Sequence, residues 1–407
     1  MAVSAGVRLV SAGAPLAGGG HADAATIAAG LAAASLPAGA HVIVDDDESA
    51  LEQALGVEGV VAVVAGVGGS AGDSVRRVLA RITGARLLLS DRMKALLEAH
   101  YGRRDRPVPR AAERLALLPQ GAVVADGDTP VWTLETGSSA WVVFLHGRLD
   151  DAVSRVLVPL AGERLGARGA IAARTFKTAG AGAEDIEERL VDRLGARDVA
   201  LTTLPGDGEV WVRVRARGAN AAAAAKRLDE IEPLVTELLG EDCYGRDGES
   251  LEAVVGGLLK ARGLTLAVAE PCTGGLVAHR LTSIAGSSAY FDRGVTAYSN
   301  RAKQELLGVD EAILRTHGAV SGPCAEAMAR GLCGRAGLVG LSVTGIAGPD
   351  AGTPAKPVGT VFIGLAVRGE AVARRFVFSG DRGSVRWQAS VMALDMLRRR
   401  LRSLGSD

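Results

Sequence analysis

Short apolar runs alternate with amphipathic stretches along the first part of the chain. Buried strands are predicted by the apolar runs GVRLVSAG, HVIVDD, GVVAVVAGVGG and WVVFLHG. Helical periodicity is found in the intervening segments ADAATIAAGLAAASL, ESALEQALG, DSVRRVLARITG and LDDAVSRVLVPLAGERLG. Strands that alternate with helices predict a doubly wound parallel α/β sheet, whose ligands bind beyond the carboxyl ends of the strands.

The pattern changes from about residue 170. EVWVRVRARG alternates strictly between apolar and polar positions, as a half-buried antiparallel strand does. Helices are predicted within TFKTAGAGAEDIEERLVDRLG and over NAAAAAKRLDEIEPLVTELLG, which is amphipathic and charged. These segments predict a small α+β domain. The glycine-rich, acidic GEDCYGRDGES is typical of a linker that leaves such a domain.

The last part of the chain returns to an α/β pattern. Strands are predicted by LTLAVAE, GVTAYS, LVGLSVTGIAGP, GTVFIGLAV and RRFVFSG. Helices are predicted over SLEAVVGGLLKARG, TGGLVAHRLTSIAG, NRAKQELLG, SGPCAEAMARGLCGRAG and DRGSVRWQASVMALDMLRRRLRSL. We expect Ser250, Asn300, Ser321 and Asp381 to cap helices, and Pro323 to lie in a first helical turn. The terminal RRRLRS run is predicted to be a solvated helix end.

Composition narrows the function classes. Lys and Arg number 46 and so do Asp and Glu, so the neutral chain gives no sign of nucleic-acid binding by bulk charge, although a local basic patch stays open. Cys243, Cys272, Cys324 and Cys333 match no zinc-site spacing and are expected to be reduced. The sequence has neither the signature of a signal peptide nor an apolar run of about 18 residues. We therefore expect a cytoplasmic protein with no membrane partner.

One short segment joins a strand to a helix through a tight loop. In LAVAEPCTGGLVAHRLTSIAG the apolar run stops at Glu270, and Pro-Cys-Thr-Gly-Gly leads into the helix. Such a loop places a nucleophile or an anion at the N-terminus of a helix, where backbone N–H groups are free. Pro271 stands out because proline has neither a nucleophilic side chain nor an N–H.

Four stretches of the last part carry a family resemblance: AEPCTGGLVAHRLTSIAGSSAYFDRGVTAYSNRAKQELLGV, HGAVS, SVTGIAGPDAGTPAKPVGTV and FSGDRGSVRWQA. They resemble the C-terminal domain of the CinA (competence/damage-inducible protein) family. That domain also occurs alone, as the bacterial nicotinamide-nucleotide amidohydrolase. The resemblance implies an N-terminal domain over 1–168 that is similar to molybdopterin-binding proteins. It also implies a small α+β linker domain over 169–245 and an amidohydrolase-like α/β domain over 246–407.

The resemblance also implies a reaction. Nicotinamide mononucleotide and water give nicotinic acid mononucleotide and ammonia, without a cofactor, after a serine attacks the carboxamide carbon. Pro271 occupies the position of that serine. Tyr298 and Lys303 correspond to the family's base, and a lysine acts as a base only where its pKa is depressed. Backbone N–H groups or side chains that would hold the oxyanion or the ligand belong to Thr273, Gly274, Gly275, Gly345, Ala347, Gly348 and Arg382.

Three hypotheses follow from the missing serine. Cys272 could replace it, since thiolates near helix N-termini are good nucleophiles, although the family keeps this cysteine beside its serine. Thr273 or an activated water could act instead. In the third hypothesis the domain binds a nicotinamide nucleotide without efficient turnover, and the residues favour this one. A rival class is a non-catalytic binding or assembly protein linked to competence or the response to DNA damage.

Other polar residues are weighed against structural roles. His317 is expected to be a structural or capping residue rather than a general base. Asp381, Arg382 and Arg386 fit an ordinary capped helix start with solvated charges, although Arg382 could also contact the phosphate of a nucleotide.

The N-terminal part departs from its family pattern. The resemblance implies a glycine-rich loop and paired aspartates that use a metal to cleave the pyrophosphate of ADP-ribose. GVGGSAGDSVRRVLARITG keeps Gly68 and Gly69, but Asp73 stands alone, and Asp150 and Asp151 follow much later. Pyrophosphate cleavage needs clustered carboxylates around its cation, so we expect no bound metal and no pyrophosphatase activity. The family also implies a homo-oligomer that forms through this domain.

Overall fold

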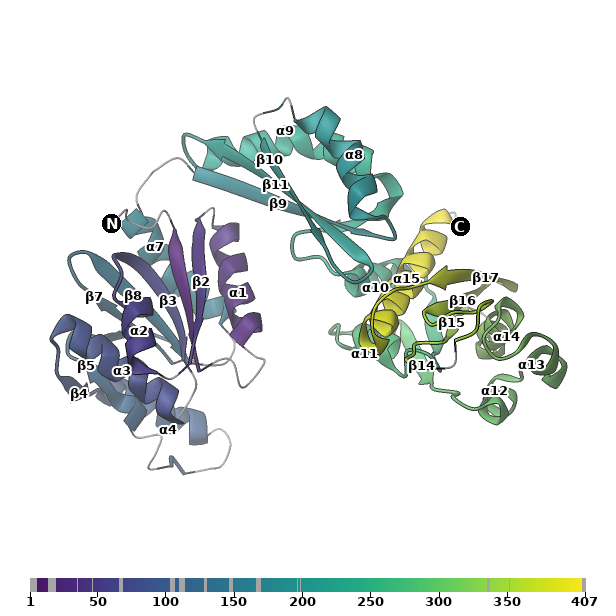
Figure 1. Cartoon of the computed structure of the whole chain (residues 1–407), viewed down its shortest axis with the longest axis horizontal. Coiled ribbons are helices and arrows are strands. Elements are labelled where there is room, and N and C mark those ends of the chain that lie inside the picture. Colours follow the sequence, from purple (N-terminus) through teal and green to yellow (C-terminus); the bar gives the residue numbers. More distant parts are fainter. Residues whose placement is uncertain are drawn as a thin grey trace. The chain divides into compact units, whose positions relative to one another are not determined.

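The computed structural model describes the chain from residue 6 to residue 404 apart from short internal gaps (Figure 1). Those gaps are residues 14–19, 35, 46, 66–68, 103–106, 110–113, 128–129, 146–148, 166–169, 196, 198, 335–336 and 351. Contacts divide the chain into two compact units, residues 1–173 with 216–228 and residues 174–215 with 229–407. The predicted α/β class is confirmed, whereas the predicted domain boundaries and the likeness to molybdopterin-binding proteins stay predictions.

The N-terminal sheet has the strand order β2-β1-β3-β8-β7-β6. Its four parallel strands are β1 (Val7–Ala12), β2 (Ala38–Val44), β3 (Gly59–Ala65) and β8 (Ser139–Leu145). The antiparallel strands β6 (Val123–Val124) and β7 (Val131–Glu135), which were not predicted, extend one edge. Few residues separate β6 from β7 and β7 from β8, and such short connections permit only antiparallel pairing, because parallel strands need a long crossover.

Helices cover both faces of this sheet, as the doubly wound prediction requires. Alternate residues of β3 belong to different cores, with Val61 and Val63 in one and Val60 and Val64 in the other. One face is covered by α2 (Glu48–Leu55), α3 (Gly69–Thr83) and α4 (Asp91–Gly102). The other is covered by α1 (Gly20–Ala33) and by the continuous α6 (Asp150–Ala152), η3 (Val153–Leu157) and α7 (Val158–Leu165). The remaining short elements are β4 (Leu87–Leu89), η2 (Arg114–Ala116) and β5 (Leu117–Pro119).

The middle sheet has the strand order β10-β11-β9-β12. Its strands are β9 (Ala170–Ala179), β10 (Val199–Pro205), β11 (Glu209–Gly218) and β12 (Cys243–Arg246). The accompanying helices are α8 (Ala183–Leu194), α9 (Ala221–Leu239) and the single turn η4 (Gly240–Asp242). The linker prediction for GEDCYGRDGES was wrong, because this segment supplies β12, which pairs with β9 and buries Tyr244. TFKTA belongs to β9, and α8 is the helix predicted within the stretch that TFKTA opens.

The C-terminal sheet has the strand order β14-β13-β15-β16-β17. The strands β13 (Thr265–Ala269), β14 (Phe291–Val295) and β15 (Leu338–Gly345) are parallel, and β16 (Thr360–Val367) and β17 (Glu370–Val377) are antiparallel. One face is covered by α10 (Leu251–Ala261), α11 (Leu276–Thr282) and α15 (Arg382–Ser403). The other is covered by α12 (Asn300–Leu307), α13 (Glu311–His317) and α14 (Gly322–Leu332), while η5 (Ser287–Ala289) precedes β14.

Helix caps agree with the sequence at three of four positions. The side chains of Ser250, Ser321 and Asp381 accept hydrogen bonds from the first turns of α10, α14 and α15, and Pro323 lies in the first turn of α14. The fourth prediction was wrong by one residue. Ser299 caps α12, and its hydroxyl accepts from the Ala302 N–H at 3.0 Å. The strand predicted over GVTAYS also lies earlier, in β14, because the chain leaves the sheet to enter this cap.

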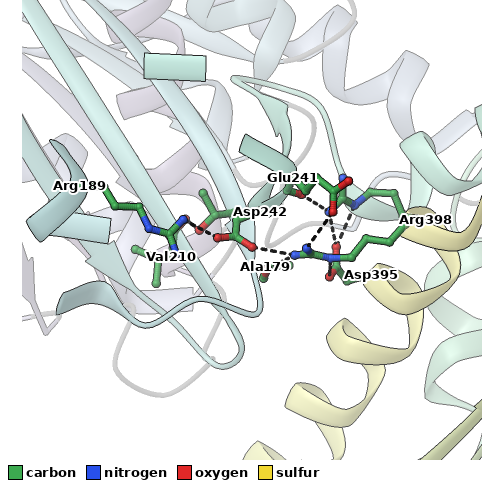
Figure 2. Close-up of polar contacts among 9 residues, drawn as sticks. Ala179, Arg189, Val210, Glu241, Asp242, Asp395 and Arg398 are labelled. Atoms are coloured by element: carbon green, nitrogen blue, oxygen red, sulfur yellow. Dashed lines mark hydrogen bonds and ion pairs between the residues drawn. The ribbon is translucent and has the colours of Figure 1, made fainter. Parts of the chain in front are cut away.

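The terminal RRRLRS run is not a solvated helix end (Figure 2). Arg398 of α15 is fully buried, pairs with the equally buried Asp395 and donates to the Glu241 carbonyl. Arg399 binds Asp395 at 2.6 Å and Asp242 at 2.8 Å. Asp242 also accepts from Arg189 of α8 at 2.7 Å. Buried guanidinium groups need such partners, so this network attaches α15 to the segment just before β12.

Every helix in the described part of the chain is too short or too polar to span a membrane.

Candidate functional site

The loop that follows β13 is organised by a buried carboxylate. Glu270 is 1% exposed, and its carboxylate accepts from the Thr273 hydroxyl at 2.8 Å. It also accepts from the N–H groups of Val277 at 2.8 Å and Ala278 at 2.9 Å. These are first-turn donors of α11, so the chain's own side chain holds the helix N-terminus. Sequence reasoning missed this role, although an acidic residue directly after a buried strand is a signal for it.

Backbone geometry decides which amides of the loop remain free. The N–H of Gly274 donates to the Glu270 carbonyl at 2.8 Å. Gly274 and Gly275 have φ of 60° and 92°, so both lie in the left-handed region that glycine tolerates, and α11 begins only at Leu276. Within the described residues the N–H groups of Thr273 and Gly275 have no acceptor. An oxyanion role stays a prediction, and the geometry favours Thr273 and Gly275 over Gly274.

The first turns of α15 hold two loops in place. Arg386 donates to the Thr273 carbonyl through Nη2 at 2.6 Å and Nε at 3.1 Å. Arg382 donates to the Gly348 carbonyl at 2.9 Å. The helix start is capped by Asp381 and Arg382 is exposed, as expected, whereas the interpretation of Arg386 as a solvated charge was wrong. Arg386 was not among the predicted site residues, because its carbonyl partner lies far away in the sequence.

A cavity of about 150 Å³ opens beside this loop, near the carboxyl ends of β13 and β15. Its lining residues are Pro271, Cys272, Tyr298, Asn300, Lys303, Ala319, Val320, Thr344, Gly345, Ala347 and Arg382. The fold thus brings most of the predicted residues together. Among the described residues, the lining omits Gly348, whose carbonyl is bound by Arg382, and the three residues from Thr273 to Gly275.

Lys303 is placed by burial at the start of α12. Its side chain is 3% exposed, and Nζ donates to the Tyr298 carbonyl at 2.8 Å. Burial lowers the pKa of Lys303, while the neighbouring Cys324 acts in the opposite direction. A lowered pKa is the direction that a base requires. The Tyr298 side chain is 69% exposed, so the lysine contacts the tyrosine through its backbone and the phenol lies toward solvent.

The loop still carries the thiol of Cys272 and the hydroxyl of Thr273, and neither group is activated as a nucleophile. Cys272 is 7% exposed, and burial raises the pKa of its thiol to about 11, although Arg382 and Arg386 oppose the shift. At neutral pH this thiol is protonated, and only thiolates attack efficiently. The Thr273 hydroxyl is fully buried and committed to Glu270. The cavity therefore contains hydrogen-bond donors and a buried lysine, but it contains no activated nucleophile among the described residues.

Two aspartates of the N-terminal part that were considered as metal ligands, Asp73 and Asp151, pair with arginines. Asp73 pairs with Arg76 and lies 3.5 Å from Arg114. Asp151 accepts from Arg155 at 2.7 Å. Gly68 lies outside the described residues, and Gly69 begins α3. In the described part of the chain no group of three or more His, Cys, Asp or Glu side chains could hold a metal ion.

His317 is separate from the cavity described above. It is the last residue of α13, its side chain is exposed, and its carbonyl accepts from Lys356 Nζ at 3.1 Å. A histidine in the last turn of a helix is favourable for the helix dipole. The expected structural role is consistent with this position.

The fold and the site define an α/β protein that carries a cavity of about 150 Å³ near the carboxyl ends of two strands of a mixed sheet. Two family models match the chain, the CinA C-terminal domain over residues 248–401 and the damage-inducible protein CinA KH domain over residues 173–245. A CinA-like protein of Geobacter sulfurreducens is 39% identical over 391 residues, which cover 93% of this chain and 94% of the relative. The chain therefore belongs to the CinA family.

A second curated relative agrees. A CinA-like protein of Salinibacter ruber is 40% identical over 352 residues, covering 84% of this chain and 85% of the relative. A solved structure of a CinA superfamily protein from Klebsiella pneumoniae is 36% identical, with a TM-score of 0.37. It covers 38% of this chain and 97% of its own.

Proposed function

We propose that the CinA C-terminal domain of this chain binds nicotinamide mononucleotide or a related nucleotide and hydrolyses its carboxamide slowly or not at all. The observation that carries the proposal is Pro271. It lines the cavity at the position where the resemblance places the attacking serine. Tyr298, Lys303 and Arg382 line the same cavity, whereas the atom that would form the acyl intermediate is missing.

The cavity supports binding of the nicotinamide end. Its volume of about 150 Å³ is below the roughly 300–1,000 Å³ of pockets that enclose whole drug-sized ligands, so the ribose and phosphate would lie outside. Arg382 is exposed at the cavity wall and could meet a phosphate, and guanidinium groups bind phosphate oxygens in bidentate fashion. The Ala347 amide, which is unpaired within the described residues, lies at the cavity wall and could contact the carboxamide.

Loss of the serine has a predictable kinetic cost. Removing a nucleophile eliminates most of an enzyme's acceleration and leaves a residual of roughly three orders of magnitude over water. Cys272 would have to ionise within an apolar cluster, where its pKa is about 11. A water activated by Lys303 is the other remaining route, and it lacks the covalent intermediate that divides the reaction into easier steps.

Calorimetry with nicotinamide mononucleotide and a parallel assay of ammonia release test the proposal on the full chain. We expect saturable binding and ammonia release that is near or below the detection limit. Rapid release of ammonia would contradict the proposal of weak turnover, and absence of binding would contradict the proposed ligand. If slow release occurs, Cys272→Ala separates the chemical routes. Loss of the activity would show that the thiol replaces the serine, and unchanged activity would exclude it.

A further inference from the structure

A second cavity lies at the antiparallel edge of the N-terminal sheet. Its volume is about 600 Å³, compared with about 150 Å³ for the cavity beside Pro271. The apolar residues of its lining are Val123, Ala125, Val156, Pro159 and Leu160. The described lining includes neither Gly69 nor Asp73, which the resemblance assigns to pyrophosphate cleavage. This space, which we name the edge cavity, is therefore distinct from the predicted metal-dependent site.

The first wall of the edge cavity is formed by β6 and β7. Trp132 and Leu134 belong to the core on one face of the sheet. Side chains alternate along a strand, so Thr133 and Glu135 lie on the opposite face. Val123 is the register partner of Thr133 and lies on that same face, where its side chain is 64% exposed. This wall therefore combines a hydroxyl and a carboxylate with an exposed apolar side chain.

The second wall is formed by the continuous helix of η3 and α7. Its lining residues follow the i, i+3, i+4, i+7 spacing of one helix face, and they are Val156, Pro159, Leu160 and Glu163. Leu157, on a neighbouring face, is fully buried in the core. The helix therefore packs on the sheet with one face and borders the cavity with another. Its η3 turn is π-helical, and such turns are frequent at functional sites.

Two arginines of this helix connect it to the sheet wall. Arg155 donates to the Asp126 carbonyl at 2.7 Å. Arg164 donates to the Glu135 carboxylate at 2.7 Å and to the Thr136 carbonyl at 3.0 Å. The helical lining residues lie between the two arginines, which are about 13 Å apart along the helix axis. Protein interiors are otherwise close-packed, so two walls that are held apart in this way form a preorganised space for a ligand.

Ion pairs neutralise the charged side chains of the edge cavity with one exception. The pairs are Asp126 with Arg92, Glu135 with Arg164, and Arg155 with Asp151. Within the described residues the Glu163 carboxylate and the Thr133 hydroxyl have no hydrogen-bond or ion-pair partner. The edge cavity therefore contains one unpaired negative charge and one unpaired hydroxyl beside its apolar side chains.

We propose that the edge cavity binds a small organic cation that has an apolar body. Its volume lies within the range of roughly 300–1,000 Å³ that is typical of small-molecule sites with apolar walls and few polar groups. The apolar side chains would bury the body of the ligand, and Glu163 would pair with its ammonium group. An anion would be repelled by Glu163, and a neutral molecule would cover this carboxylate without giving it a partner. The arginine contacts limit the length of the space, which favours a compact ligand over an extended peptide.

The test is calorimetry on the full chain with three probes of similar shape, 2-naphthylmethylammonium, 2-naphthylmethanol and 2-naphthoate. We expect saturable binding of the ammonium that is about fivefold tighter than binding of the alcohol, as one partly exposed ion pair would give. The naphthoate should bind most weakly. Glu163→Gln should remove the preference for the ammonium over the alcohol and leave the affinity for the alcohol within twofold.

Two further variants separate the apolar wall from the charge. Leu160→Ser should weaken the ammonium and the alcohol by the same factor and preserve the preference between them, and unchanged affinities would contradict the assignment. Glu98→Gln is the matched control, because it removes an exposed carboxylate from α4 on the opposite face of the sheet. Circular dichroism melts establish that each variant folds.

A preference for the ammonium that disappears in Glu163→Gln and persists in Glu98→Gln supports the proposal. The proposal is overturned if the ammonium shows no saturable binding at millimolar concentration, or if the alcohol or the naphthoate binds as tightly. It is equally overturned if Glu163→Gln keeps the preference. Nicotinamide mononucleotide should not displace the ammonium, and displacement would assign the ammonium to the cavity beside Pro271 instead.

Discussion

Pro271 and Cys272 show how adjacent residues of one loop can share a wall of a cavity and differ in chemistry. Pro271 has no reactive atom, and Cys272 has one that burial keeps protonated. The cysteine lies within an apolar cluster, so its thiolate would lose hydration, and the opposing charges of Arg382 and Arg386 do not compensate for that loss. Position at a loop before a helix is therefore not sufficient to activate a thiol.

Alkylation should report this environment directly. Because burial raises the pKa of Cys272 to about 11, the reactive thiolate increases with pH up to that value. We expect iodoacetamide to modify Cys272 slowly at pH 7.5, with a rate that rises about tenfold per pH unit through pH 9.5. Peptide mapping by mass spectrometry distinguishes it from the other cysteines. Rapid modification at neutral pH that levels off below pH 8 would contradict the described environment.

At the scale of elements, α11 depends on a side chain outside it. The helix has only seven residues, and Glu270 satisfies two of its first-turn N–H groups. The sequence predicted a longer helix over TGGLVAHRLTSIAG. The glycines at 274 and 275 adopt left-handed conformations instead and keep the loop out of the helix.

Replacing Glu270 should loosen the loop and the helix together. Glu270→Ala leaves the N–H groups of Val277 and Ala278 and one buried hydroxyl without acceptors, at a cost of about 3 kcal/mol. Glu270→Gln retains one carbonyl oxygen and serves as the milder control. Hydrogen exchange of the peptide that contains Val277 and Ala278 should accelerate strongly in Glu270→Ala and less in Glu270→Gln. Unchanged protection in both variants would show that the carboxylate does not hold the helix.

Strand and helix alternation, three of four caps and most cavity residues could be predicted from the sequence, because each leaves a local signature. The edge strands β6 and β7 could not, since short apolar segments carry little periodicity. Arg386 and Arg398 looked like solvated charges. Their partners, the Thr273 carbonyl and Asp395 with the Glu241 carbonyl, are assembled by the tertiary fold.

At the scale of the whole molecule, basic and acidic side chains are concentrated on different elements and are not mixed evenly along the chain. The neutral total combines the basic strands of the middle sheet, the acidic helices α8 and α9 and the buried network of Figure 2. Within that network burial alone would raise the pKa of Asp242, but hydrogen bonds from Arg399 and Arg189 outweigh it and hold the pKa below the ordinary value of 3.8. The stabilisation is therefore present above that value and is lost as pH falls through the folded-state pKa.

A pH series of melting temperatures tests this contribution. Asp242→Asn should melt below the parent chain at pH 6, because the charged partner of Arg399 and Arg189 is removed. The difference should shrink as pH falls below 4, where protonation removes the same charge from the parent. Asp207→Asn, at an exposed carboxylate, is the matched control and should have little effect. A difference that stays constant from pH 6 to pH 3 would refute the linkage.

We propose that Pro271 is the residue that separates a nucleotide-binding site in this chain from an amidohydrolase. Ammonia release from nicotinamide mononucleotide by the parent chain and by Pro271→Ser, each at saturating nucleotide, tests it most directly. The account predicts that the serine variant releases ammonia at least about a hundredfold faster, with similar affinity for the nucleotide. A serine variant that binds the nucleotide but is no faster than the parent would contradict it.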